Sequence, residues 1–203
     1  MKRYFTDHGN VPRFTKNGYL KVKCPPVLWG VIKDVYNILL SLPAEKESVV
    51  GNDKDICELY KIHRFPNIAQ YFLQELLPLH EWWSGQSLVP VTLWGVRNYP
   101  NGSKLDLHHD RAPTHHISSI IMVDKDLNKK KDWPLVIQDH KGEWNEVYTE
   151  PGEIILYESL ACIHGRPNLF EGNYFRNFYV HYRLKDYDYV GLNDTPRGEI
   201  IKR

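Results

Sequence analysis

Little in the 203-residue sequence points to a membrane, a secretory route or a polyanionic partner. It contains no run of roughly 18 apolar residues, so we expect no membrane-spanning helix and no membrane partner. The N-terminal residues include no apolar stretch typical of a secretory signal, which predicts a cytoplasmic protein. Lysine and arginine number 26 against 25 aspartates and glutamates, giving a net charge of +1. This balance argues against nucleic acid as a partner, because nucleic-acid-binding domains are usually strongly basic.

Cysteine is also scarce, with Cys24, Cys57 and Cys162 far apart in the chain. An odd number at this spacing fits neither a disulfide framework nor a structural zinc site, so we expect a protein of a reducing compartment. Hydrophobic residues make up 42% of the chain and aromatic residues 13%, which is enough to fill a core and argues against disorder. At this length we predict a single domain over residues 1–203.

Two stretches in the N-terminal part carry the periodicity of amphipathic helices. Apolar residues recur at helical spacing over residues 28–42, between prolines suited to a first turn and to a stop. A second helix is predicted over residues 66–83, interrupted at Pro78 and ended by Gly85. Residues 43–65 between the helices are expected to form a loop with room for a short strand. Both helices should pack on one face of a sheet.

After Gly85 the apolar period changes from about 3.6 to 2, the period of β-strands. Turn signals such as Pro-Asn-Gly and Pro-Gly separate the short segments, as in sandwiches and jelly rolls. We predict eight strands: Val89–Tyr99, Leu105–His108, His116–Val123, Leu135–Asp139, Glu143–Tyr148, Glu153–Glu158, Ala161–His164 and Tyr174–Arg183. The chain is thus predicted to be mostly β, with an N-terminal helical support region (1–85), a β core (86–185) and a polar tail (186–203).

Two histidines and an aspartate in the β region match the donor set of one kind of metal site. His108 and Asp110 are two residues apart at the end of a predicted strand, so both side chains can point to the same side. His164 ends another predicted strand and can supply the third ligand. Two imidazoles and one carboxylate form the facial triad that holds Fe(II) and leaves open coordination positions, although they also bind manganese, cobalt or zinc. The pattern predicts metal-based chemistry, since no nucleophile pattern of the Ser/His/Asp or Cys/His type is present.

Seven sequence blocks occur in a fixed order around these residues: Thr92–Tyr99, Gly102–Arg111, Ser118–Ile121, Trp133–Leu135, Pro151–Ser159, His164–Pro167 and Asn177–Tyr182. In this order they resemble the Fe(II)/2-oxoglutarate dioxygenases. The likeness is greatest to the prolyl 4-hydroxylase-like branch found in microbial, algal and viral genomes. It covers residues 75–184, a little over half of the chain, and leaves the residues before 66 unplaced.

The resemblance implies a double-stranded β-helix, a jelly roll of the cupin type, with iron bound by His108, Asp110 and His164. It implies that Fe(II), 2-oxoglutarate and O2 act together, with ascorbate as reductant, to hydroxylate a C–H bond while 2-oxoglutarate is converted to succinate and CO2. Related halogenases replace the carboxylate ligand, so Asp110 favours hydroxylation. Peptidyl proline is the substrate expected from the branch. A small molecule or free amino acid is an alternative substrate, and a non-catalytic β-helix binding module is an alternative function.

The distal carboxylate of 2-oxoglutarate needs a cation and a hydroxyl, because burying an unpaired carboxylate is very costly. Tyr99 matches the strand tyrosine with which the family binds this carboxylate. Prolyl hydroxylases usually place a lysine or arginine on the last core strand. With Asn177 aligned to the family's asparagine, that position falls on Asn173, which carries no charge.

Three arginines could replace the missing cation. Arg166 ranks first because on an extended strand it shares the face of His164. Arg176 ranks second, since a bulge could turn it toward the site, and Arg97, on the same face as Tyr99, ranks third. For the substrate the candidate contacts are Arg111, which follows the metal motif, and Trp133, at the end of a charged loop that could cover the iron.

Overall fold

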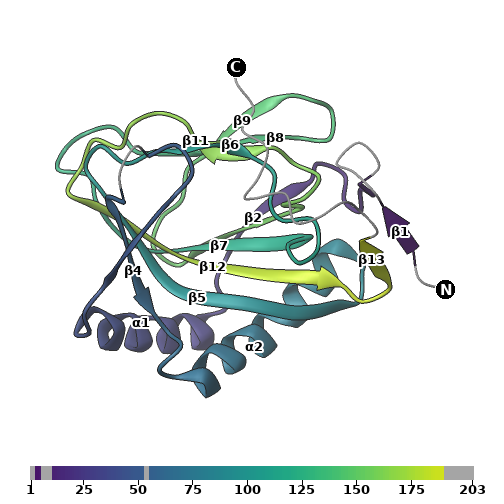
Figure 1. Ribbon diagram of the computed structural model, residues 1–203, viewed down its shortest axis with the longest axis horizontal. Coiled ribbons are helices and arrows are strands. Elements are labelled where there is room, and N and C mark those ends of the chain that lie inside the picture. The colour runs from purple at the N-terminus through teal and green to yellow at the C-terminus, as the bar shows by residue number, and fades with distance from the viewer. Residues whose placement is uncertain (1–2, 6–10, 53–54, 190–203) are drawn as a thin grey trace.

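Two antiparallel sheets and two helices make up most of the computed structural model, which describes residues 3–5, 11–52 and 55–189 (Figure 1). The larger sheet has the strand order β2-β10-β7-β12-β5-β4-β3, and the smaller has the order β6-β11-β8-β9. Their bounds are β2 (Tyr19–Lys23), β3 (Glu45–Glu47), β4 (Cys57–Lys61), β5 (Leu88–Pro100), β6 (Leu105–His108), β7 (Ile117–Asp126), β8 (Leu135–Gln138), β9 (Trp144–Val147), β10 (Glu153–Tyr157), β11 (His164–Arg166) and β12 (Tyr174–Leu184). Separately, β1 (Arg3–Phe5) pairs in parallel with β13 (Tyr187–Tyr189).

The eight strands from β5 to β12 form a double-stranded β-helix, because β5, β7, β10 and β12 lie in the large sheet and β6, β8, β9 and β11 in the small one. Each overlaps one of the eight predicted strands, and the predicted fold class is confirmed. The main difference is β11, which begins at His164 and not at Ala161. The amides of Ala161 and Cys162 donate to the Glu158 carbonyl and form a turn there.

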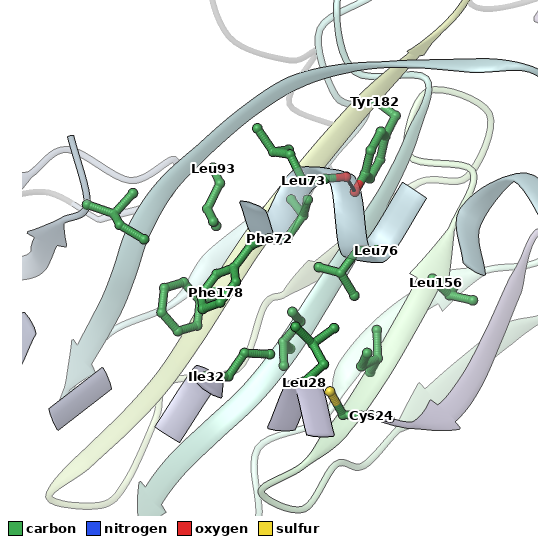
Figure 2. Close-up of a cluster of buried hydrophobic side chains, with 14 of the residues drawn as sticks. Cys24, Leu28, Ile32, Phe72, Leu73, Leu76, Leu93, Leu156, Phe178 and Tyr182 are labelled. Carbon is green, nitrogen blue, oxygen red and sulfur yellow. Dashed lines mark hydrogen bonds between the residues drawn. The ribbon is translucent and has the colours of Figure 1, made fainter. Parts of the chain in front are cut away.

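The helices α1 (Pro26–Leu40) and α2 (Pro66–Ser84) cover the outer face of the large sheet, on the side away from the small sheet (Figure 1). Figure 2 shows the packing between them: Ile32 of α1 and Phe72 of α2 meet Phe178 of β12, and the rings of Phe72 and Phe178 lie edge to face with centroids 6.0 Å apart. This apolar layer fixes the back of the large sheet and leaves its inner face for a second core and the site.

The predicted interruption of the second helix at Pro78 is wrong, since α2 runs through this residue without a break. Proline lacks an amide hydrogen and removes one helical hydrogen bond. Leu76 and His80, on either side of it, are both fully buried against the sheet core. The burial of this helix face outweighs the lost bond. Gly85 ends the helix with a left-handed conformation (φ 63°), as predicted.

The N-terminal region contributes strands as well as helices. β2 extends one edge of the large sheet by pairing with β10, and β3 and β4 extend the other edge beside β5. The sequence analysis predicts no strand at β2, which is partly exposed along its length. Of the predicted polar tail (186–203), residues 187–189 form β13 and most of the rest lies outside the described residues. None of the described helices combines the length and apolarity needed to cross a bilayer.

Residues 45–52, which we call the strap, link the edge of the large sheet to that of the small sheet. The strap begins as β3, and its Val50 carbonyl accepts a hydrogen bond from the Asp106 amide of β6 (3.0 Å). The Asn52 side chain accepts from the Lys104 amide (2.9 Å) and donates to the Lys104 carbonyl (2.7 Å). These bonds hold the strap across the open side of the β-helix, next to the metal motif.

Candidate metal and cofactor site

His108, Asp110 and His164 come together at one end of the β-helix. His108 of β6 lies opposite His164 of β11 in the antiparallel register, and their ring centroids are 4.5 Å apart. Asp110 Oδ1 lies 3.6 Å from His108 Nε2 and 3.8 Å from His164 Nε2. The three ligand atoms lie within 4.8 Å of one another, so a single ion can reach all of them.

Backbone carbonyls fix the orientation of both imidazoles. His108 Nδ1 lies 2.7 Å from the Asp106 carbonyl oxygen, and His164 Nδ1 lies 2.9 Å from the Cys162 carbonyl oxygen. A carbonyl can only accept, so each Nδ1 donates its hydrogen to a carbonyl and each Nε2 is left facing the Asp110 carboxylate. This is the arrangement that orients metal-binding histidines in proteins.

The electrostatics keep the cluster ready for a cation. Burial alone would raise the pKa of Asp110, but the hydrogen bond with His108 and the nearby His164 and His181 lower it well below its usual value. Burial and repulsion from His108 lower the pKa of His164 to about 4. At neutral pH the aspartate is therefore ionised and His164 is neutral, as metal binding requires. Burial lowers the pKa of His108, but the Asp110 carboxylate raises it by more, so an incoming ion would displace a proton from this imidazole.

The second oxygen of Asp110 is held by a network that sequence reasoning missed. The Ser118 hydroxyl lies 3.4 Å from Asp110 Oδ2, 2.8 Å from His181 Nδ1 and 2.6 Å from the Ser159 hydroxyl. Burial and the stacked ring of His115 lower the pKa of His181 well below its usual value, so this imidazole is neutral. Ser118 and His181 are register partners on β7 and β12, a relation that only the sheet pairing reveals.

Loss of the Ser118 hydroxyl should weaken metal binding without unfolding the protein. We expect Ser118→Ala to raise the Kd for Co(II) by about tenfold, the lower end of effects seen for groups that orient metal ligands. Ser119→Ala is the matched control, because the adjacent hydroxyl is also buried but has no hydrogen-bond partner among the described residues. Titration with Co(II), followed by visible absorption, measures both. Equal changes in the two variants would contradict the role of Ser118.

The turn before β11 supports the cluster from behind. The Ser159 carbonyl accepts a hydrogen bond from the Asp110 amide (2.9 Å). The adjacent Glu158 carboxylate is 1% exposed and accepts from the backbone amides of Phe14 (3.0 Å) and Thr15 (2.8 Å). The N-terminal residues that the sequence left unplaced thus anchor the turn that positions two metal ligands.

A cavity of about 500 Å³ opens onto the metal ligands. The inner face of the large sheet forms one wall with Arg97, Tyr157, Tyr179 and His181, and the strap forms another. Arg111 and the exposed ring of Trp94 also line the cavity. A cavity of this size is typical of sites for small ligands.

Arg166 is a buried cation with unused hydrogen-bond donors. It is 1% exposed, its Nη1 donates to the Trp133 carbonyl, and its guanidinium stacks on Phe175 with the ring centroid 4.5 Å away. Nε and Nη2 are buried and have no partner within hydrogen-bond distance among the described residues, although the Tyr179 hydroxyl lies near the guanidinium. Burial lowers the pKa of Arg166 but leaves the group charged. Such a group is costly unless an anion joins it.

No protein-family model matches the sequence, and no curated protein matches it either. Solved structures do match. A 2OG-Fe(II) oxygenase family oxidoreductase from Burkholderia pseudomallei superposes with a TM-score of 0.66 at 11% identity, covering 92% of this chain and 97% of that chain. A prolyl-4-hydroxylase from Pseudomonas putida gives a TM-score of 0.61 at 12% identity (84% and 94%). HygX from Streptomyces hygroscopicus, solved with nickel, 2-oxoglutarate and hygromycin B bound, gives 0.62 at 11% (83% and 84%).

This chain has the fold of the 2-oxoglutarate/Fe(II) oxygenases. Within that fold Tyr99 lies on the inner face of β5 and is fully buried. Its hydroxyl lies 2.9 Å from that of Tyr179 on β12. Asn177, two residues before Tyr179, is also fully buried, and both its side-chain polar atoms lack a hydrogen-bond partner among the described residues. These groups form a polar inner layer of the oxygenase fold.

The other two arginines have different surroundings. Arg97 lines the cavity, but its guanidinium already donates hydrogen bonds to both carboxylate oxygens of Glu47, each at 2.6 Å. Arg176 faces the opposite side of the sheet, where it donates to Tyr36 of α1 (2.8 Å) and to Asn98 (3.1 Å). The expectation that a bulge turns Arg176 toward the site is therefore wrong, since the strand alternation holds at this position.

The side chain of Trp133 is buried, whereas a residue that contacts substrate must face the cavity. Its side chain is 4% exposed and packs edge to face on Tyr99 and Phe175, and its indole N–H donates to the Asn168 carbonyl (2.7 Å). The prediction that Trp133 contacts substrate is wrong, because the ring belongs to the core between the sheets. Arg111 lines the cavity, and its role as a substrate contact stays a prediction.

Proposed function

We propose that this protein is an Fe(II)- and 2-oxoglutarate-dependent oxygenase that hydroxylates a C–H bond, with peptidyl proline as the first candidate substrate. The proposal rests on two features found together. One is the cluster of two histidines and one aspartate, and the other is Arg166, a buried arginine with unsatisfied donors two residues after His164. A ligand that chelates a metal at one end and carries a carboxylate at the other suits both features. 2-Oxoglutarate has this chemistry.

The donor chemistry fits the metal, because two neutral imidazoles and one carboxylate suit Fe(II) and leave coordination positions for other ligands. When bound, Fe(II) would supply the site at which 2-oxoglutarate and O2 meet and the substrate is oxidised. The chain itself contributes orientation. The carbonyls of Asp106 and Cys162 hold the imidazoles, and Ser118 and His181 hold the Oδ2 atom of Asp110.

In this proposal Arg166 neutralises the distal carboxylate of 2-oxoglutarate. Its free Nε and Nη2 hydrogens offer the two donors that a carboxylate accepts side by side. The hydroxyl pair of Tyr99 and Tyr179 can add a donor, and the Asn177 amide lies on the same strand face. Arg97 is a weaker choice, because Glu47 already satisfies its charge.

The choice of proline rests on the sequence resemblance to prolyl 4-hydroxylases, and one of the similar structures is a prolyl-4-hydroxylase. A small molecule is the second candidate. It is favoured by the strap, which forms one wall of the cavity and so helps to enclose it. HygX, with hygromycin B bound, illustrates that proteins of this fold hold small molecules. A non-catalytic module is disfavoured, since the metal cluster and the buried arginine are both intact.

Succinate formation tests the proposed function directly. We expect the purified protein to convert 2-oxoglutarate to succinate under air with Fe(II) and ascorbate, slowly alone and faster with a substrate from a panel of proline-containing peptides and small molecules. Reactions without iron are the control. If no condition yields succinate, and if 2-oxoglutarate gives no heat on titration into the Ni(II)-loaded protein, the chain is a binding module and not an oxygenase.

A further inference from the structure

The charged side chains around the cavity are paired, with one exception. Three ion pairs involve its lining: Glu47 with Arg97, Glu45 with Lys61, and Lys46 with Glu58. Asp110 belongs to the metal cluster. Arg111 also lines the cavity, is exposed, and makes no side-chain hydrogen bond or ion pair within the part of the chain that the structure describes. Its guanidinium is thus the cavity charge that still lacks a counter-charge.

The backbone around Arg111 holds this side chain close to the metal cluster. Arg111 directly follows Asp110, and its carbonyl accepts hydrogen bonds from the amides of Thr114 (3.2 Å) and His115 (2.8 Å). This turn leads into β7, where the His116 amide donates to the Tyr182 carbonyl (3.0 Å). The guanidinium is therefore carried on a hydrogen-bonded turn and lines the same cavity as the metal ligands.

The charge balance at the site leaves one positive charge over, which suits an anionic ligand at this position. With Fe(II) and 2-oxoglutarate bound as proposed above, the charges of the ion and Arg166 cancel those of Asp110 and the two carboxylates of 2-oxoglutarate. The ion pairs around the cavity are also neutral. Arg111 retains its positive charge, and neither the cofactors nor the residues that the structure describes supply its partner.

We propose that Arg111 binds a carboxylate of the substrate, so that the enzyme selects substrates with an acidic group close to the carbon that reacts. A guanidinium suits this task because it binds a carboxylate through two parallel hydrogen bonds. The ring of Trp94, 56% exposed on the cavity wall, offers an apolar surface for the carbon skeleton. The carboxylate has two possible sources: the α-carboxylate of a free amino acid, or an acidic side chain beside the reacting residue of a peptide. This inference rests on the proposed function and narrows its substrate class.

Matched acids and amides test the proposal. The panel contains free L-amino acids, proline included, each with its amide, and proline peptides with glutamate or glutamine beside the proline. Binding to the Ni(II)- and 2-oxoglutarate-loaded protein is measured by calorimetry, and turnover as succinate formed above the substrate-free rate. We expect at least one acid to bind about ten- to a hundredfold more tightly than its amide, as for a charged hydrogen-bond pair. Which pair responds identifies the source of the carboxylate.

Variants assign the preference to one residue. Arg111→Gln should remove the preference for the acid, and Arg111→Lys should retain part of it. Lys141→Gln removes one positive charge from the exposed turn between β8 and β9 and should change nothing. Equal binding of acids and amides, an unchanged preference in Arg111→Gln, or no binding of any acid would overturn the proposal. Substrate-free succinate formation judges the oxygenase function separately, and we expect it to be the same in Lys141→Gln and the wild type.

Discussion

Replacing His164 with alanine is expected to abolish metal binding and succinate formation together. The remaining His108 and Asp110 cannot hold one face of an octahedral ion, and the turn that carries Cys162 and Ser159 loses its link to the metal. His164 is 2% exposed, so water cannot easily take over the vacant coordination position. We expect the Kd for Co(II) to rise by more than about a hundredfold, since even the groups that orient metal ligands can contribute that much. Co(II) absorption and the succinate assay measure the two effects.

The matched control is His63→Ala, which removes an exposed histidine near the start of α2 and should leave both measurements unchanged. Because His164 is buried, loss of activity could also come from unfolding. His164→Gln keeps much of the volume of the side chain, and circular dichroism of both variants reports the fold. Wild-type turnover in a folded His164→Ala protein would remove His164 from the metal site and with it the proposed mechanism.

Most of the β-helix follows from local patterns in the sequence. The strands from β5 to β12 show period-2 alternation, since one face of each lies in the core between the sheets. The two ligands His108 and Asp110 share one strand end, so their proximity could also be predicted. The strands at the sheet edges could not be found in this way, because β3 is largely exposed and lacks an apolar face.

Other parts of the site depend on tertiary contacts. The partners of Asp110 are Ser118 and His181, which meet only through the pairing of β7 with β12. Trp133 borders a charged loop in the sequence, but its ring fills the space between Tyr99 and Phe175 in the core. Sequence position identifies neither the neighbours nor the burial of such residues. For Arg166, strand parity predicted an inward side chain, whereas its unsatisfied donors are visible only in the structure.

Replacing Arg166 with glutamine is expected to weaken 2-oxoglutarate binding on the order of a hundredfold, because truncating one partner of a buried charge pair leaves the other unpaired. The metal affinity in the absence of 2-oxoglutarate should stay near that of the wild type, since Arg166 is not among the metal ligands. Calorimetry with the Ni(II)-loaded protein gives the Kd for 2-oxoglutarate, and the succinate assay gives its KM. A defect in the metal site would weaken the binding of both the metal and 2-oxoglutarate. Loss of 2-oxoglutarate binding alone would therefore show that Arg166 binds the cofactor and does not support the metal.

Three further variants locate the carboxylate. Arg166→Lys keeps the charge but not the side-by-side donors, so we expect an intermediate loss, and it also preserves part of the packing on Phe175. Arg176→Gln should leave 2-oxoglutarate binding unchanged, because its guanidinium bonds to Tyr36 on the helix side of the sheet. Arg97→Gln tests the remaining cation, which Glu47 already neutralises. Unchanged binding in Arg166→Gln together with a large loss in Arg97→Gln would mean that 2-oxoglutarate displaces Glu47 from Arg97, and the strap would then have to open for the cofactor to bind.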